Sequence, residues 1–124
     1  MSRELDKAIA RLLGYEVDWE YTRVAGEYGH KSFLAGVWGV YKDGKRIGEI
    51  PHYSTDGNYM LELDREMRER EWMLLLNLSR SNRKDFVAIY QADGERTAHG
   101  IAETIPEAVA LAAYHALTGK EWTQ

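Results

Sequence analysis

The 124-residue chain contains no cysteine, which excludes disulfides, thiol catalysis and cysteine-ligated zinc. It has no apolar run near the ~18 residues that a membrane-spanning helix needs. It also lacks a basic excess, since 16 Lys and Arg stand against 20 Asp and Glu, for a formal net charge of −4. Because an extended nucleic-acid footprint usually needs a basic face, we expect no duplex DNA or RNA partner. Because no apolar run is long enough, we also expect no membrane partner. The first residues lead directly into a helical pattern rather than a secretory signal, which predicts a cytoplasmic protein.

What is present indicates one soluble, globular domain over residues 1–124. The composition is 44% hydrophobic and 29% charged, which is typical of such domains. A chain of this length buries about two-thirds of its unfolded surface, so it needs no disulfide or structural metal. We find no repeat, low-complexity segment or interdomain linker.

Helical periodicity predicts three helices. Residues 2–13 place apolar side chains on one face, and Gly14 suits the helix stop. A middle helix follows Asp56, with i,i+4 ion pairs expected between Glu66 and Arg70 and between Arg65 and Glu69. An Ala-rich helix at 105–118 begins at the capping box of residues 104–107.

Alternation and composition predict five or six strands. They are residues 15–24, two runs that flank Asp43-Gly44, a buried strand in 72–80, and two further strands in 85–91 and 95–103. Asp43-Gly44 and Asp93-Gly94 are both typical of tight hairpin turns. The order of elements predicts an α+β fold: an α-β-α sandwich with three helices and an antiparallel sheet of five or six strands.

A dense polar segment precedes the middle helix: His52, Tyr53, Ser54, Thr55 and Asp56. One interpretation is a helix cap, because Ser, Thr and Asp satisfy free backbone N–H groups. The other is an anion site, because a helix N-terminus attracts phosphate and two aromatic rings stand beside it. Arg80 and Arg83, at the turn after the next strand, are the best cations for gripping phosphate oxygens.

Aromatic residues are the richest feature, with four Trp, eight Tyr and two Phe. Trp19 and Tyr21 share one strand face, and Trp38 lies in the next predicted strand. Core packing explains such residues, but aromatics also mark interfaces and stacking platforms for bases. Because so small a domain cannot hide all of them, we expect a homo-oligomer.

Catalytic and metal motifs are missing. None of the four histidines is paired at i,i+3 or i,i+4, so the sequence predicts no metal site and no cofactor. There is no G-x-S-x-G, Walker or Rossmann pattern, and no catalytic residue is predicted. Gly36 and Gly39 are interpreted as strand glycines that permit close packing.

Three stretches together resemble a known family. RELDKAIARLLGY at the start, PHYSTD before the middle helix and TIPEAVALAAYHAL at the end resemble the phage ABA sandwich domain family. The resemblance covers most of the chain and is weakest over residues 16–48. It implies a bacteriophage origin and the cytoplasm of a bacterial host, and it carries no catalytic residue.

These observations predict a non-enzymatic phage accessory protein, with an anti-defence role, that sequesters a small anionic ligand such as a cyclic nucleotide signal. One alternative is a protein-binding module that occupies a host protein, and another is an enzyme that acts on a nucleotide. The residues expected to bind the ligand are His52, Tyr53, Ser54, Thr55, Asp56, Arg80, Arg83, Trp19 and Trp38.

Overall fold

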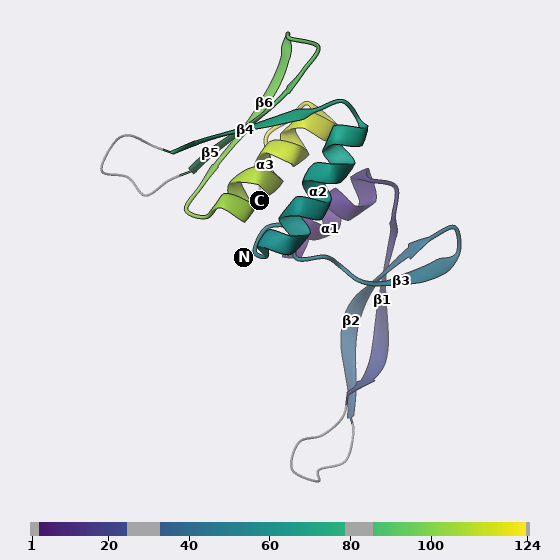
Figure 1. The fold of residues 1–124 in the computed structure, drawn as a ribbon. Coiled ribbons are helices and arrows are strands. Elements are labelled where there is room, and N and C mark those ends of the chain that lie inside the picture. Colours follow the sequence, from purple (N-terminus) through teal and green to yellow (C-terminus); the bar gives the residue numbers. More distant parts are fainter. Residues whose placement is uncertain (1–2, 25–32, 79–85, 124) are drawn as a thin grey trace.

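Helix caps and tight turns divide the chain into short elements (Figure 1). The computed structural model describes residues 3–24, 33–78 and 86–123, so Arg80 and Arg83 lie outside the described residues. The elements in chain order are α1 (Arg3–Leu12), β1 (Glu16–Val24), β2 (Phe33–Lys42), β3 (Lys45–Glu49), α2 (Gly57–Glu69), β4 (Met73–Leu78), β5 (Phe86–Ala92), β6 (Arg96–Ala102) and α3 (Ile105–Thr118).

The three predicted helices are confirmed, and so are the glycine stops of α1 and α3. Gly14 follows α1 with a φ of +96°, and Gly119 ends α3 with a φ of +75°, both in the left-handed region. The Thr104 hydroxyl accepts the Glu107 backbone N–H at 3.4 Å, as expected for the capping box. On α2, Arg70 and Glu66 form the expected pair at 3.7 Å, whereas Arg65 and Glu69 form no ion pair in the described part of the chain.

Both predicted hairpin turns are confirmed. Asp43 and Gly44 have φ values of +55° and +78° between β2 and β3. Asp93 and Gly94 have φ values of +57° and +70° between β5 and β6. Asp and Gly tolerate this conformation better than most residues, which is why these dipeptides predicted the turns.

The strands form two sheets. One has the order β1-β2-β3 and the other β4-β5-β6, and every pairing is antiparallel. The α+β class with an antiparallel arrangement is confirmed, but a single sheet of five or six strands is not. Each turn specifies only the pairing of neighbouring strands, and α2 intervenes between β3 and β4, so the two groups stay separate.

The core lies between the second sheet and the helices. α3 packs on β5 and β6 and contacts α1 and α2 (Figure 1). Small residues bring α3 close to the sheet, since a Cβ built on Gly100 would lie 2.6 Å from the Ala112 backbone nitrogen. Along β6, Ala98 and Gly100 are buried, whereas the alternating His99 and Ile101 are exposed. In the described part of the chain the helices therefore cover one face of this sheet, and the three-layer sandwich is not confirmed.

The prediction that β4 is buried is wrong. Met73, Leu75 and Leu76 keep 67%, 45% and 48% of their side-chain surface exposed. The reason is position, because β4 is the edge strand of its sheet and α3 packs over the other two strands.

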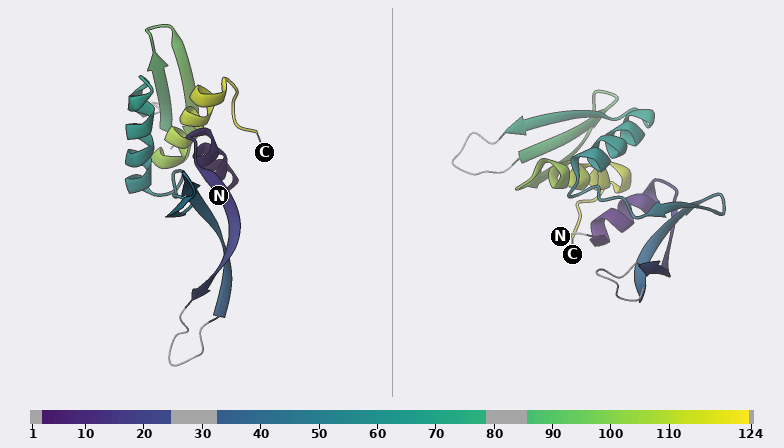
Figure 2. Two further views of the ribbon diagram at one scale, coloured as in Figure 1. Left: turned by 90° about the vertical axis from the view of Figure 1, so that its right-hand side faces the viewer. Right: turned by 60° about the horizontal axis from the view of Figure 1, so that its bottom comes forward.

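The first sheet is a twisted ribbon, and β1 and β2 extend away from the helices (Figures 1 and 2). Gly36 and Gly39 on β2 permit close packing, as predicted. The Trp19 ring lies over Gly36, and the Glu20 carboxylate lies over Gly39. None of the helices in the described ranges has the length and apolar character needed to cross a bilayer.

Candidate functional site

Helix α1 holds the segment that precedes α2. The buried Asp6 carboxylate accepts the Ser54 backbone N–H at 2.9 Å and pairs with Arg3 at 3.0 Å. The Arg3 guanidinium also donates to the Ile50 carbonyl at 2.8 Å and to His52 Nδ1 at 2.9 Å. Our sequence interpretation missed both residues. An acidic residue beside the buried Leu5, Ile9 and Ala10 was the available signal for Asp6.

Most of the polar segment builds the start of α2. Asp56 is the N-cap, since its carboxylate accepts the Asn58 N–H at 2.8 Å, which confirms the predicted cap. Ser54 is buried, and its hydroxyl has no hydrogen-bond partner among the described residues. Tyr53 is 4% exposed, whereas His52 and Thr55 are exposed. Because Tyr53 is buried, it presents no open surface on which a base can stack, and the role predicted for these residues in binding an anion stays a prediction.

The two tryptophans meet as cross-strand neighbours. Trp19 and Trp38 pair directly across β1 and β2, with ring centroids 5.1 Å apart in an edge-to-face arrangement. Lys7 Nζ lies 3.9 Å from the centre of the Trp38 ring and 3.2 Å from Glu4. The cations nearest the tryptophans and His52 are thus already engaged, Lys7 by Glu4 and Arg3 by Asp6 and the backbone.

A pocket of about 230 Å³, which we name the α2 pocket, lies beside this segment. On α2, Tyr59, Glu62 and Glu66 recur at helical spacing and face it together. Its full lining is Tyr15, Val40, Ile47, Gly48, Glu49, Pro51, Tyr53, Tyr59, Glu62 and Glu66. Three tyrosines and three glutamates therefore surround one concavity, and no Lys or Arg of the described residues lines it.

The carboxylates of the α2 pocket are only partly neutralised. Glu66 accepts the Tyr15 hydroxyl at 3.4 Å and pairs with Arg70. Within the described ranges, Glu49 and Glu62 form no ion pair. A further cation, Lys42, places its Nζ 5.3 Å from the Tyr15 ring centre. Two carboxylates are therefore free to face a ligand.

Two phenols of the pocket have raised pKa values. Burial, followed by the nearby Glu66 charge, raises the pKa of Tyr15. Burial also raises the pKa of Tyr53, with further contributions from Tyr15, Glu66 and Glu62. Tyr53 lines the pocket, and its hydroxyl has no hydrogen-bond partner among the described residues. The site thus offers hydroxyls, aromatic faces and negative charge.

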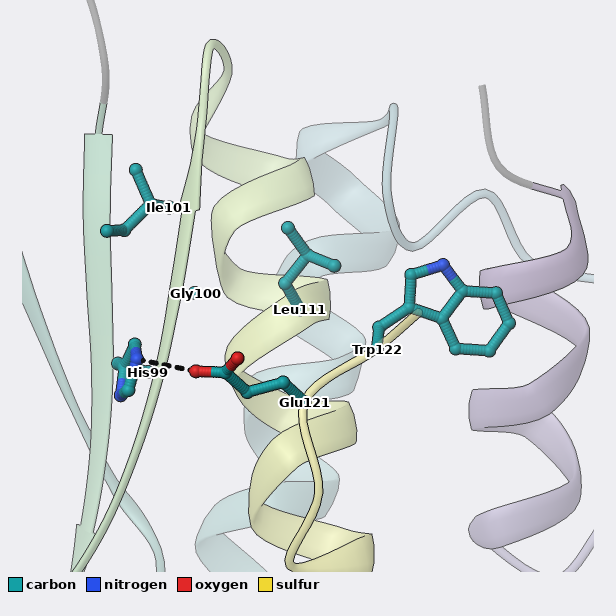
Figure 3. Close-up of a pocket in the computed structure, with 6 residues that line it drawn as sticks. All are labelled: His99, Gly100, Ile101, Leu111, Glu121 and Trp122. Atoms are coloured by element: carbon teal, nitrogen blue, oxygen red, sulfur yellow. Dashed lines mark ion pairs between the residues drawn. The ribbon is translucent and has the colours of Figure 1, made fainter. Parts of the chain in front are cut away.

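A second pocket, of about 240 Å³, lies where the C-terminal residues pass β6 (Figure 3). Its lining includes His99, Leu111, Glu121 and Trp122. His99 Nε2 lies 3.1 Å from the Glu121 carboxylate, and the His99 backbone N–H donates to His115 Nδ1. Because its polar groups satisfy one another, this pocket offers less to a ligand than the α2 pocket. Over residues 3–24, 33–78 and 86–123, no cluster of three or more His, Asp or Glu is arranged to hold a metal ion.

No family model, curated protein or solved structure matches the chain. The resemblance to the phage ABA sandwich family therefore stays a prediction, and function has to be inferred from the site.

Proposed function

We propose that this chain is a non-enzymatic protein-binding module whose α2 pocket receives a basic side chain of its partner. The observation that carries the proposal is the unpartnered hydroxyl of Tyr53, a residue only 4% exposed, in a pocket with carboxylates on its walls. A guanidinium or ammonium group would gain charge-assisted hydrogen bonds from Glu49 and Glu62 and contact the tyrosine faces.

The size of the α2 pocket favours a single side chain. Its volume of about 230 Å³ falls below the roughly 300–1,000 Å³ of ordinary small-molecule sites. A nucleotide is too large for it, and the carboxylates would repel its phosphates. The exposed Ile47 at the same pocket gives the stem of a long side chain an apolar surface to cover.

The proposal favours the protein-binding alternative over the small anionic ligand. A phage accessory role in the cytoplasm of a bacterial host, which the resemblance implies, suits a module that occupies a host protein. The anionic-ligand hypothesis stays a prediction that depends on Arg80 and Arg83, outside the described residues. Calorimetry against cyclic mono- and dinucleotides tests it.

Calorimetric titration with a short arginine peptide tests the proposal, with the matching citrulline peptide as an uncharged control. We expect the arginine peptide to bind and the citrulline peptide not to bind. Changing Glu49→Gln together with Glu62→Gln should weaken arginine-peptide binding by about tenfold or more, because charge-assisted contacts are lost.

A matched control separates the pocket from the overall charge. Glu95→Gln with Glu103→Gln changes the net charge equally at two exposed positions outside the pocket lining. Binding should then stay within a few-fold of the parent. The proposal is wrong if both peptides bind alike, or if the two double variants weaken binding equally.

A further inference from the structure

Strand β4 presents an open backbone edge. It pairs with β5 on one side, and within the described ranges its other side has no strand partner. Its sequence, MLLLNL, contains no charge, proline or glycine. An edge strand of this kind is a ready template for pairing with another strand.

The other strand edges are protected. β1 carries Glu16, Asp18 and Glu20, and β3 carries Lys45, Arg46 and Glu49. On β6, the His99 backbone N–H is already bound by His115 Nδ1 at 3.1 Å. Charges and side-chain bonds of this kind block edge pairing. Among the described strands, β4 is therefore the edge left without such protection.

β4 is also apolar on both faces. Met73 and Leu75 lie on the face away from the helices, and Leu76 lies on the helix side, each about half exposed or more. A strand that faced only solvent at its edge would carry polar residues on at least one face. A continued sheet would satisfy the free backbone edge and give these apolar side chains same-face neighbours on the adjoining strand.

We propose that β4 pairs antiparallel with β4 of a second copy of this chain, which gives a continuous sheet with the order β6-β5-β4-β4-β5-β6. A strand that meets itself about a two-fold axis is self-complementary, because each free N–H meets a free C=O. The occupant is a second copy because MLLLNL carries no charge, so β4 opposes no like charges where the two-fold axis brings it against itself. This inference is independent of the α2 pocket.

Light scattering with matched variants tests the pairing. The parent should have twice the 14.3 kDa chain mass at micromolar concentrations. Leu75→Lys should give a monomer, because it places a charge from each copy in the middle of the paired strands, where the two charges lie close together. Ile101→Lys is the control, since Ile101 lies on the same sheet at its opposite edge and is 56% exposed. It should remain a dimer.

Cysteine substitutions keep the test valid where a lysine variant fails to fold, because the parent has no thiol. Single cysteines are placed at Leu74, Leu75, Leu76 and, as a control, Ile101. The position on the two-fold axis faces itself, so one of the three β4 variants should form a disulfide-linked dimer under mild oxidation. A monomeric parent, a folded Leu75→Lys dimer, or cross-linking of Ile101→Cys as fast as the β4 variants would each overturn the proposal.

Discussion

Two aspartates fix the place where α2 begins. Asp56 caps the helix through the Asn58 N–H, and Asp6 binds the Ser54 N–H from a helix 48 residues away in the chain. The first contact is local, and the residue types near it predicted the cap. The second joins distant segments, and no local pattern announces it. A short polar segment therefore needs both a local and a remote carboxylate to hold its shape.

The first prediction concerns this cap. Asp56→Ala should lower the free energy of unfolding by about 1 kcal/mol, because the Asn58 N–H loses its acceptor. Urea denaturation monitored by circular dichroism measures the change. Thr55→Ala is the control, since the exposed neighbouring side chain makes no capping bond. Equal stability of the Asp56 variant and the parent would contradict the capping role.

At the scale of the element, Gly100 on β6 and Gly36 on β2 show how closely a strand packs against the group that covers it. A Cβ on Gly100 would lie 2.6 Å from the Ala112 backbone nitrogen and 2.7 Å from Leu111 Cβ, both in α3. A Cβ on Gly36 would instead meet the Trp19 ring, a side chain that is half exposed. The first neighbour is a packed helix that cannot give way, and the second is a ring that can turn into solvent.

The second prediction follows from that contrast. Gly100→Ala should destabilise the fold by roughly 1–3 kcal/mol, because it overpacks the contact between β6 and α3. Gly36→Ala should cost less, since Trp19 can move and alanine favours a strand more than glycine does. Thermal denaturation of the two variants measures both changes. A larger loss of stability from Gly36→Ala would contradict this order, because it would mean that the contact between Gly36 and Trp19 is packed more tightly than the contact between Gly100 and α3.

The sequence predicted elements better than their placement. Asp-Gly turns, the capping box and the glycine helix stops are local, so both hairpins and the ends of α1 and α3 agreed with the structure. The run MLLLNL reads the same on a central strand and on an edge strand, so its exposure was not predictable. The α2 pocket draws residues from 15 to 66, and the spacing of Tyr59, Glu62 and Glu66 indicates only its α2 wall.

At the scale of the whole molecule, the helical layer is joined to the second sheet by a buried hydrogen bond. The Tyr90 hydroxyl on β5 donates to the Asp64 carboxylate on α2 at 3.0 Å, and Arg68 pairs with the same carboxylate at 2.9 Å. Burial, followed by the Asp64 charge, raises the pKa of Tyr90. Burial raises the pKa of Tyr53, which precedes α2, as well. Both phenols are thus held protonated by the folded state.

The third prediction is a loss of stability in alkali. A folded-state pKa raised above the ordinary 10.0 means that these phenols stabilise the fold fully below pH 10, and that the stabilisation is lost as pH rises further. The urea midpoint should therefore fall steeply above pH 10. Tyr90→Phe should make the fall shallower, because it removes the Tyr90 phenol, one of the phenols whose pKa is raised. A midpoint that does not change with pH, or an equal slope in the variant, would contradict this origin.

The pairing of each strand with its neighbour in sequence has a consequence for the order of folding. β4, β5, β6 and α3 are consecutive and contact one another, so their contact order is low and their loop-closure cost is small. α1 packs on α3, at the opposite end of the chain, so its docking has to wait until α3 is formed. We therefore expect the second sheet with α3 to be the nucleus and α1 to dock last. In native-state hydrogen exchange, α1 amides should open with a lower free energy than those of β5.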